Sequence, residues 1–420
     1  MTLRVGVFPH ADVPHIIPCF RICRQLLNWG YEVRVLGSDV EVVGRGHSEA
    51  WRDLLARYGL SGRQVVRSSR DLSFSDWLTQ QLTTLKLDIL ILDAVWQGLA
   101  FACHSSDLVR NVVVHHAGLP DFRSSDMPTW AFVHPGHSKD RWAQARRTAE
   151  QFERSGNGVR AVVSSIKALA STCTTTGADF EFGCGEFAAL PAVRAMSLCP
   201  AVEFPAERGR IDYFGTLLPD PGDIDWKSPP SELIDESKSL ITCMFGTTGL
   251  QTREEFKWLA TLAETLARAF PNGQVLVVIP DWASSQWPTD DRPKNLMSYP
   301  WIPLWELLST RRGSKVLVST PGVGALREAI ASGTPVVAIP RRVDQFGAAA
   351  RVEYFNLGSC LISRELPKSD LVVERVAQVL EDPDIQVQAQ RLRQECAALD
   401  ATKPLKRFIE NPIRGGSRTP

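Results

Sequence analysis

The strongest constraint on the fold is an alternation of short apolar runs and amphipathic stretches that occurs twice along the chain. In the first half, the apolar runs are LRVGVF, EVRVL, DILILD and NVVVHH. Segments with helical periodicity separate them: Ile16, Phe20, Cys23 and Leu27 recur at steps of 4, 3 and 4, and a further helix is expected near Phe74 to Leu85. Strands that are apolar throughout and separated by helices are typical of a parallel sheet covered on both faces. The sequence therefore predicts a doubly wound α/β architecture.

A stretch rich in proline and acidic residues, from Leu217 to Ser237, separates the two alternations. This composition is typical of a linker. The alternation then restarts with SLITCMF, a helix near Arg253 to Phe270, and the runs QVLVVIP, KVLVS and PVVAIP. At 420 residues, with 44% hydrophobic residues, the chain is long enough for two cores. We expect Rossmann-like domains at 1–218 and 239–400, a linker at 219–238, and at 401–420 a helix and tail that return to the first domain.

Charge and cysteine content exclude several classes of protein. Lys plus Arg and Asp plus Glu both number 47, which gives no electrostatic reason to expect a nucleic acid or an anionic membrane as partner. The nine cysteines form no CxxC pair, so we interpret them as reduced thiols in a cytoplasmic protein. No apolar run approaches the roughly 18 residues of a membrane span. We expect a cytoplasmic monomer or homodimer.

Two glycine-containing turns follow strands in the second half, in MFGTTG (244–249) and in TPGVG (320–324). A strand, a turn of small residues and a helix N-terminus can hold a phosphate, because backbone N–H groups and the helix dipole point outward there. Gly246 with Thr247 would lie on one side of a diphosphate, and Thr320, Gly322, Val323 and Gly324 on the other. A tight strand-to-helix turn needs glycine for structural reasons as well, so each turn alone leaves both interpretations open.

Further polar and aromatic residues surround these turns. Trp301 lies between prolines just after a strand, where its ring could stack on a base. Glu328 is four residues beyond Gly324 on the same helix, placed to accept hydrogen bonds from a ribose or to form a surface ion pair. Asp344 and Gln345 follow a strand end, where doubly wound sheets place ligand contacts.

The order W-x-P, glycine turn, Glu-Ala, SGTPVVAIP and Asp-Gln, from Trp301 to Gln345, resembles the donor-binding signature of GT-B nucleotide-sugar glycosyltransferases of the natural-product type. The resemblance implies two Rossmann-like domains that face each other across a cleft. It implies that Trp301 stacks on the base and that Ile302 contacts the base through its backbone. It also implies that Glu328 binds the ribose, and that Asp344 and Gln345 bind the sugar. Where the family usually has His-Gly-Gly, this chain has Thr320-Pro321-Gly322, so a hydroxyl replaces the imidazole that contacts the diphosphate.

The N-terminal half resembles the same family in PHADVPHIIPCFRICRQLLNWGYEV. The register to Pro18 and Gly30 selects His15, not His10, as the equivalent of the general base. An imidazole there can take a proton from an acceptor hydroxyl, although a histidine at a helix start is also a common capping residue. The resemblance implies that Asp93, at the end of DILILD, orients this base. Its role would be that of the aspartate in a catalytic triad, but without a covalent nucleophile. Asp12 is the alternative base.

These observations predict an inverting glycosyltransferase that moves a sugar from a UDP- or dTDP-sugar to a hydroxyl or amine of a small acceptor. Aromatic residues in the first half favour a lipophilic natural-product acceptor, with Asp12, Trp96, His116 and Trp130 as candidate contacts; some of these aromatics, Trp77 and Trp142 included, could equally belong to the core. The Asp-x-Asp sequences at 223–225 and 382–384 fall in the linker and at a helix start, and the resemblance implies no catalytic metal or other cofactor. A sugar-nucleotide epimerase of the same fold and a catalytically silent helper of a partner transferase remain alternatives.

Overall fold

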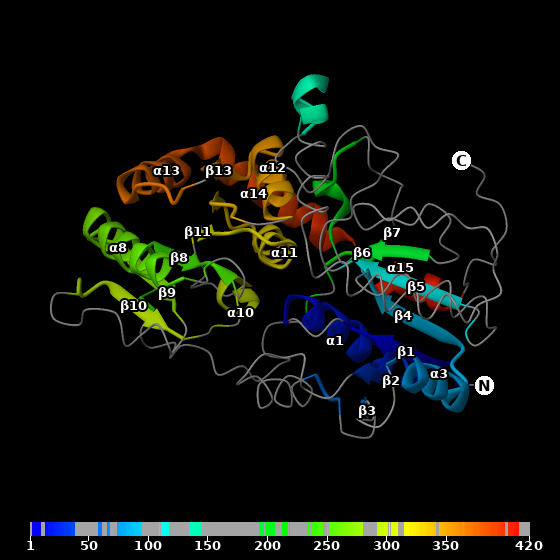
Figure 1. Cartoon of the computed structure of the whole chain (residues 1–420). Helices are drawn as coiled ribbons and strands as arrows, with labels where there is room; N and C mark the ends of the chain where they lie inside the picture. Colours follow the sequence, from blue (N-terminus) through cyan, green and yellow to red (C-terminus); the bar gives the residue numbers. More distant parts are fainter. Residues whose placement is uncertain are drawn as a thin grey trace.

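The chain forms two parallel β-sheets, each flanked by helices (Figure 1). The first has seven strands in the order β3-β2-β1-β4-β5-β6-β7, and the second has six in the order β10-β9-β8-β11-β12-β13. All paired strands run parallel. In each sheet the first strand in sequence lies inside the sheet and later strands extend it on both sides. This is the doubly wound topology that the apolar runs predict, and the predicted fold class is confirmed.

The computed structural model describes residues 2–9, 13–37, 58–60, 65–67, 74–94, 109, 111–116, 134–144, 193–196, 198–205, 212–216, 218, 234–235, 237–246, 250, 252–279, 292–300, 302, 304–309, 315–341, 344–363, 365–399 and 402–410. The strands of the first sheet are β1 (Arg4–Phe8), β2 (Glu32–Gly37), β3 (Val65–Arg67), β4 (Ile89–Asp93), β5 (Asn111–His116), β6 (Val193–Met196) and β7 (Asp212–Tyr213). Those of the second are β8 (Leu240–Met244), β9 (Gln274–Val278), β10 (Leu296–Tyr299), β11 (Val316–Ser319), β12 (Val336–Ala338) and β13 (Gly358–Cys360).

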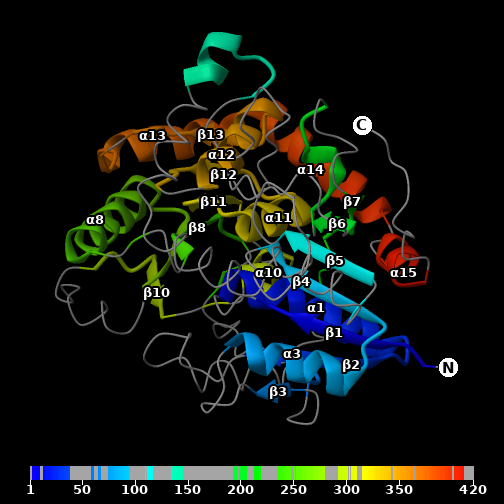
Figure 2. The same cartoon turned by 45° about the vertical axis from the view of Figure 1, so that its right-hand side comes forward.

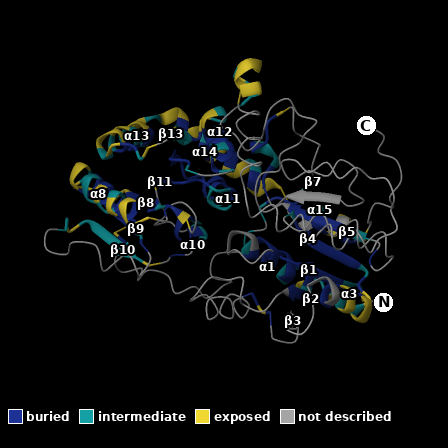
Figure 3. Cartoon of the chain, viewed as in Figure 1, coloured by how far each residue is buried: buried dark blue, intermediate teal, exposed yellow. Residues whose placement is uncertain are grey.

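The helices lie between these strands and after them. They are α1 (Val13–Asn28), α3 (Phe74–Leu85), the short 3₁₀ helix η2 (Pro200–Val202), α8 (Arg253–Ala269), α10 (Leu304–Ser309), α11 (Val323–Ser332), α12 (Gln345–Tyr354), α13 (Ser369–Glu381), α14 (Pro383–Ala398) and α15 (Thr402–Glu410). The central strands β1, β4, β8, β9, β11 and β12 are mostly buried, whereas the edge strands β10 and β13 have intermediate burial. Exposed residues collect on the outer faces of helices such as α3, α8 and α13 (Figure 3).

Local sequence explains where the helices of the second half begin and end. The α8 helix starts with a capping box, in which Thr252 accepts a hydrogen bond from the backbone of Glu255 and the Glu255 side chain accepts one from the backbone of Thr252. The α11 helix ends at Gly333, whose φ of 71° is the left-handed conformation typical of a helix C-terminus. Both signals are local, so these boundaries follow directly from the sequence.

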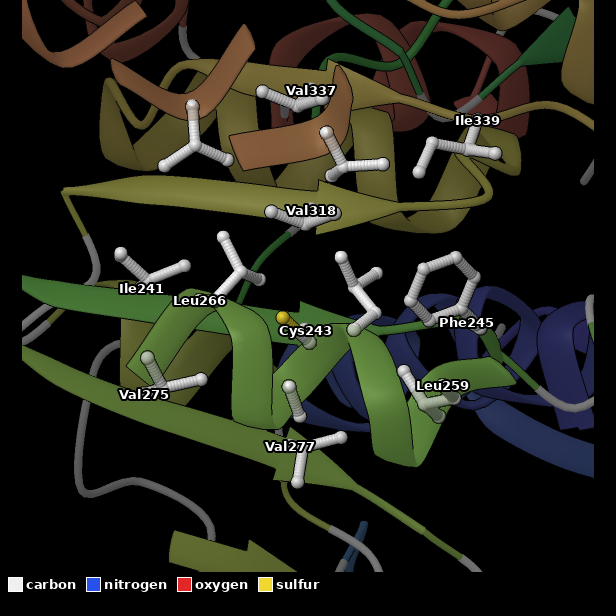
Figure 4. Close-up of a cluster of buried hydrophobic side chains, with 14 of the residues drawn as sticks. Ile241, Cys243, Phe245, Leu259, Leu266, Val275, Val277, Val318, Val337 and Ile339 are labelled. Atoms are coloured by element: carbon white, nitrogen blue, oxygen red, sulfur yellow. The ribbon is translucent and has the colours of Figure 1, made fainter. Parts of the chain in front are cut away.

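The core of the second half lies between its sheet and the helices α8 and α13. Ile241, Cys243, Val275, Val277 and Val318 point from the strands toward Leu259 and Leu266 of α8 (Figure 4). Branched aliphatic side chains on these parallel strands leave no polar face, which is why the strands read as continuous apolar runs.

The core of the first half includes the last helix of the described chain. Leu405 and Ile409 of α15 are buried in one cluster with Val5 and Val7 of β1 and with Ile16 of α1. Figures 1 and 2 show α15 beside the strands of the first sheet, although α15 directly follows α14 in sequence. The C-terminal segment therefore packs on the N-terminal half.

A third cluster joins the two halves. Leu198, Cys199 and Val202 around η2 pack with buried residues of α10, α11 and α14. Residues that precede the predicted linker in sequence, most of which lies outside the described residues, thus contribute to the apolar packing of the second half.

Candidate functional site

Parallel pairing brings both glycine turns to one edge of the second sheet. Met244 of β8 pairs with Ser319 of β11, so the residues that follow each strand lie at the same carboxyl edge. After β8 the chain turns through Gly246, whose φ of 63° is left-handed and favours glycine. After β11 it turns through Thr320, Pro321 and Gly322 into α11. Carboxyl edges of doubly wound sheets are where such folds bind ligands.

The side chain of Thr320 is used by the fold. It is buried, and its Oγ1 donates a hydrogen bond to the carbonyl oxygen of Phe245 over 2.7 Å. A threonine hydroxyl has one hydrogen. Because that hydrogen is donated to Phe245, the side chain joins the two turns and does not offer a donor to a phosphate in this structure.

The N-terminus of α11 presents backbone groups instead. Gly322 is the N-cap residue and supplies no side-chain cap, and its carbonyl accepts the hydrogen bond from Leu326 N over 3.0 Å. The first turn of an α-helix leaves N–H groups without partners inside the helix, and the helix dipole adds partial positive charge there. Gly322, Val323 and Gly324 therefore lie where an anion is favoured. A Cβ added at Gly324 would lie 3.8 Å from Nη2 of Arg327, so a guanidinium is close to the same turn.

Glu328, the predicted ribose ligand, is bound across the two halves. Its Oε1 accepts a hydrogen bond from Nη2 of Arg21 on α1 over 3.0 Å, and the two side chains are 13% and 5% exposed. Arg327 is buried beside the same group. Burial and the charge of Arg21 lower the pKa of Arg327 to about 10, against the opposing charges of Glu328 and Tyr58.

Asp344 and Gln345 lie at the turn between β12 and α12. Asp344 is the N-cap residue of α12 and makes no side-chain cap. Gln345 is buried, and its Oε1 accepts a hydrogen bond from the backbone of Arg341 over 2.9 Å, which closes the turn. Both residues thus follow the strand next to β11, at the edge that carries the glycine turns.

The remaining predicted donor residues divide into two groups. Ile302 is buried with Leu240, Leu276 and Leu307, which leaves its backbone as the group that a base could contact. Thr247 and Trp301 lie outside the described residues.

The predicted catalytic residues lie at the carboxyl edge of the first sheet. His15 is in the first turn of α1, which follows β1, and Asp93 ends β4, which pairs with β1. The side chains of His15 and His116 are outside what the structure describes, and so are Asp12, Trp96 and Trp130. Of the other aromatics considered for the acceptor, Trp77 is buried against Phe8, with ring centroids 6.4 Å apart, and belongs to the core.

Two further buried residues surround Asp93. One ligating atom each of Cys19, Asp93 and His115 lies within 4.8 Å of the others, and Cys19 Sγ is 3.9 Å from Nδ1 of His115. Burial, followed by the charges of Asp93 and Cys23, raises the pKa of the Cys19 thiol well above its ordinary value. The His115 ring stacks on Phe214, with centroids 6.4 Å apart. Asp93 is therefore enclosed by a protonated thiol and an imidazole. These three side chains could bind a cation only if the thiol lost its proton.

A second group with metal-ligand spacing joins the halves at the surface. It consists of His134, His137 and Glu353, with Nε2 of His134 3.2 Å from Oε2 of Glu353 on α12. Nδ1 of His134 accepts a hydrogen bond from the backbone of Gly136 over 3.1 Å. A neutral imidazole that accepts at Nδ1 carries its proton on Nε2, so this nitrogen donates to Glu353 and has no lone pair for a metal. The geometry favours a hydrogen bond over a cation site.

A buried ion pair also crosses the halves near η2. Arg351 of α12 pairs with Glu203, and both side chains are almost fully buried. Glu203 also accepts from the Tyr213 hydroxyl over 3.0 Å and from the Phe204 backbone over 2.9 Å. Arg351 donates to the Gly347 carbonyl over 3.1 Å and lies 4.5 Å from the centre of the Phe204 ring. This network holds η2 against α12.

Sequence reasoning missed Arg21, Arg327 and the Glu203–Arg351 pair. The signal for Arg21 was present, because it is a charged residue between Phe20 and Ile22, within the apolar run that precedes Arg24. A charge in such a position is expected to have a specific partner. Nothing local identifies Glu328 as that partner, 307 positions away.

Comparison with known proteins identifies similar chains. Residues 268–406 match the family described as "Erythromycin biosynthesis protein CIII-like, C-terminal domain". The chain is 29% identical to oleandomycin glycosyltransferase of Streptomyces antibioticus over 118 residues, which are 28% of this chain and 26% of that protein. It is 24% identical to 4'-demethylrebeccamycin synthase of Lentzea aerocolonigenes over 98% of this chain and the whole of that protein. The chain thus covers about a quarter of the first relative and all of the second.

Solved structures show the same fold over the whole chain. The glycotransferase of kitacinnamycin superposes with a TM-score of 0.68, at 17% identity, and covers 98% of this chain and 99% of its own. Spinosyn rhamnosyltransferase SpnG complexed with thymidine diphosphate has a TM-score of 0.62 at 16% identity and covers 97% and 100%. The predicted GT-B fold and the predicted resemblance are confirmed, and the matches support the coarser prediction of a glycosyltransferase of the natural-product type. Within the described residues, no helix combines the length and the apolar character that crossing a membrane requires.

Proposed function

We propose that this chain is an inverting glycosyltransferase that moves a sugar from a UDP- or dTDP-sugar to a hydroxyl or amine of a small, lipophilic natural-product acceptor. The observation that carries the proposal is the contact between α1 and α11. The helix that begins near His15 and the helix that carries the predicted donor residues touch through Arg21 and Glu328 over 3.0 Å. A general base at the N-terminus of α1 and a diphosphate bound at the N-terminus of α11 would then act on the same acceptor and donor.

The proposed reaction is a single displacement. His15 takes the proton of the acceptor hydroxyl as its oxygen bonds to the anomeric carbon, and the bond from that carbon to the diphosphate oxygen breaks, which inverts the configuration. Asp93 stabilises the imidazolium that forms. The scheme invokes no metal ion or other cofactor.

The leaving diphosphate would be bound by backbone groups. Because Thr320 donates its hydrogen to Phe245, the amides in the first turn of α11 and the turn at Gly246 take the role that an imidazole has in the related signature. Such preorganised donors stabilise the charge that develops on a leaving group. Asp344 and Gln345, at the neighbouring strand end, are the proposed sugar ligands.

The test is transfer by a His15→Ala variant, with His10→Ala as the matched control. The acceptors are a panel of aromatic and macrolide alcohols, the donors are UDP- and dTDP-sugars, and products are detected by mass spectrometry. We expect His15→Ala to lose about 10²–10⁴-fold in rate while His10→Ala stays near wild type and both bind the nucleotide normally. Near-wild-type transfer by His15→Ala would overturn the assigned base. Isomerised donor formed without acceptor would instead favour the epimerase alternative.

A thermal-shift series with UDP, dTDP and GDP tests donor binding without any acceptor. A ligand that binds only the folded state raises the melting temperature. We expect UDP or dTDP to stabilise the protein more than GDP. If none of the three stabilises it, the proposed function is wrong.

A further inference from the structure

The carboxylate of Glu328 is only half used by the protein. Its Oε1 accepts the hydrogen bond from Arg21, while no residue in the described part of the chain donates to its Oε2. The side chain retains 13% exposure, whereas that of Arg21 is 5% exposed. One oxygen is therefore held from the opposite sheet, and the other remains available as an acceptor.

The surroundings of Arg21 fix it in this position. Burial acts to lower the pKa of Arg21, but the neighbouring Tyr58 and Glu328 raise it by more, so the net shift is upward. Two of its nitrogens, Nε and Nη1, are buried without a hydrogen-bond partner in the ranges that the structure describes. Its bond to Glu328 is thus its main directional contact. Arg327 is buried beside the same carboxylate.

The other buried ion pair between the halves is arranged differently. Both oxygens of Glu203 accept hydrogen bonds from the protein, and Arg351 has further contacts with Gly347 and Phe204. An ion pair that serves only to join the halves can have all its carboxylate oxygens bound by the protein in this way. In the Arg21–Glu328 pair, by contrast, Oε2 of Glu328 accepts no hydrogen bond from the described residues, and Glu328 lies on α11, the helix that begins at the turn where an anion is favoured.

We infer that Arg21 is a positioning residue for the nucleotide, and that it holds Glu328 from the opposite domain so that Oε2 accepts a hydrogen bond from a ribose hydroxyl. The inference rests on the proposed function for the presence of a nucleotide. It assigns part of the donor site to the N-terminal half, where the sequence predicts only acceptor and catalytic residues. Nucleotide affinity then depends on how α1 lies against α11.

The test is isothermal titration calorimetry on the full chain. The probes are UDP and 2′-deoxyUDP, or, if dTDP binds more tightly, dTDP and 3′-deoxythymidine diphosphate. In each pair the second probe lacks one ribose hydroxyl. We expect the wild type to bind the complete nucleotide about tenfold more tightly than the deoxy analogue, as one hydrogen bond to a charged group allows.

Arg21→Gln should reduce the affinity for the complete nucleotide about tenfold and leave the affinity for the deoxy analogue nearly unchanged, because only the former uses Glu328. Arg21→Met, which fills the same buried space, serves if the glutamine variant does not fold. Adding Glu328→Gln to either variant should cause no further loss, since both changes remove the same contact. The control is Arg391→Gln, which breaks the exposed pair of Arg391 with Glu395 on α14 and should leave both affinities unchanged.

Equal losses for both members of a probe pair, or none, would overturn the inference, because an arginine that only supports the fold cannot distinguish a hydroxyl. Additive losses from Arg21 and Glu328 changes would overturn it as well. If the wild type binds neither UDP nor dTDP, the proposed function fails first. If it binds one of them and Arg21→Gln has wild-type affinities, only this inference fails.

Discussion

Among the residues that the structure describes, two buried ion pairs join the halves, and they differ in how many hydrogen bonds their carboxylates accept. Glu203 and Arg351 form a closed network in the sense that both carboxylate oxygens of Glu203 accept hydrogen bonds, from Arg351, the Tyr213 hydroxyl and the Phe204 backbone. Arg21 and Glu328 share one hydrogen bond and leave a carboxylate oxygen open. The first pair lies beside η2, and the second joins the middle of α1 to the middle of α11.

The difference separates two uses of buried charge. A closed network stabilises one arrangement, because breaking it leaves a buried charge without compensation. An open pair stabilises less, but it presents an oriented acceptor to a ligand. Stability measurements should therefore respond mainly to the first pair, and ligand affinity mainly to the second.

The largest expected effect on stability is that of Arg351→Ala. The change leaves Glu203 buried without its cation, which costs about 3–5 kcal/mol of unfolding free energy. Chemical denaturation followed by circular dichroism measures the loss. The double variant Glu203→Gln/Arg351→Met should recover part of it, because no unpaired charge remains.

Arg21→Ala is the matched comparison, and it should cost less than Arg351→Ala, because Glu328 is more exposed than Glu203. An equal loss for the two arginine variants would show that both pairs contribute equally to stability, which would contradict a difference in role between a closed and an open pair.

A smaller effect is expected for the apolar attachment of α15. Leu405 is fully buried in the core of the first half, so Leu405→Ala should cost about 3 kcal/mol through lost burial and the cavity left behind. The melting temperature reports the change. Leu399→Ala is the control, since Leu399 is 41% exposed and should change little; comparable shifts for the two variants would argue against the packing of α15 on this core.

The smallest effect is expected at the surface contact between His134, His137 and Glu353. Burial, then the charges of His134 and Arg141, lower the pKa of His137, against the opposing charge of Glu353. The folded state therefore binds a proton less readily than the unfolded chain. Stability from this group is complete above the unfolded pKa of about 6.5 and is lost as the pH falls below it. His137→Gln should make the melting temperature less sensitive to acid between about pH 7 and 5; identical pH profiles for variant and wild type would exclude this contribution.

Much of the fold could be predicted because its signals are local. The helices expected near Phe74 to Leu85 and near Arg253 to Phe270 correspond to α3 (Phe74–Leu85) and α8 (Arg253–Ala269). Apolar runs predict parallel strands because both faces of such a sheet are covered. The glycine turns also follow their strands as expected, since pairing of β8 with β11 brings them to one edge.

The partners of the polar side chains could not be predicted in the same way. Thr320 was expected to face a phosphate, yet its hydroxyl binds the carbonyl of Phe245, 75 positions away. Glu203 and Arg351 are 148 positions apart. The first contact depends on which strands pair within the second sheet, and the second depends on how the two halves pack against each other. Periodicity along the sequence encodes neither. The assignments of His15, Asp93 and the donor residues remain predictions for the experiments above.

The packing of α15 has a consequence for synthesis on the ribosome. Val5 is among the first residues made, but the cluster that buries it is complete only when Leu405 and Ile409 have emerged. A nascent chain whose second sheet has already formed would still expose apolar surface on the first. The apolar core of the N-terminal half can therefore be completed only after the residues of α15 have been synthesised, and apolar surface that stays exposed until then is prone to aggregation.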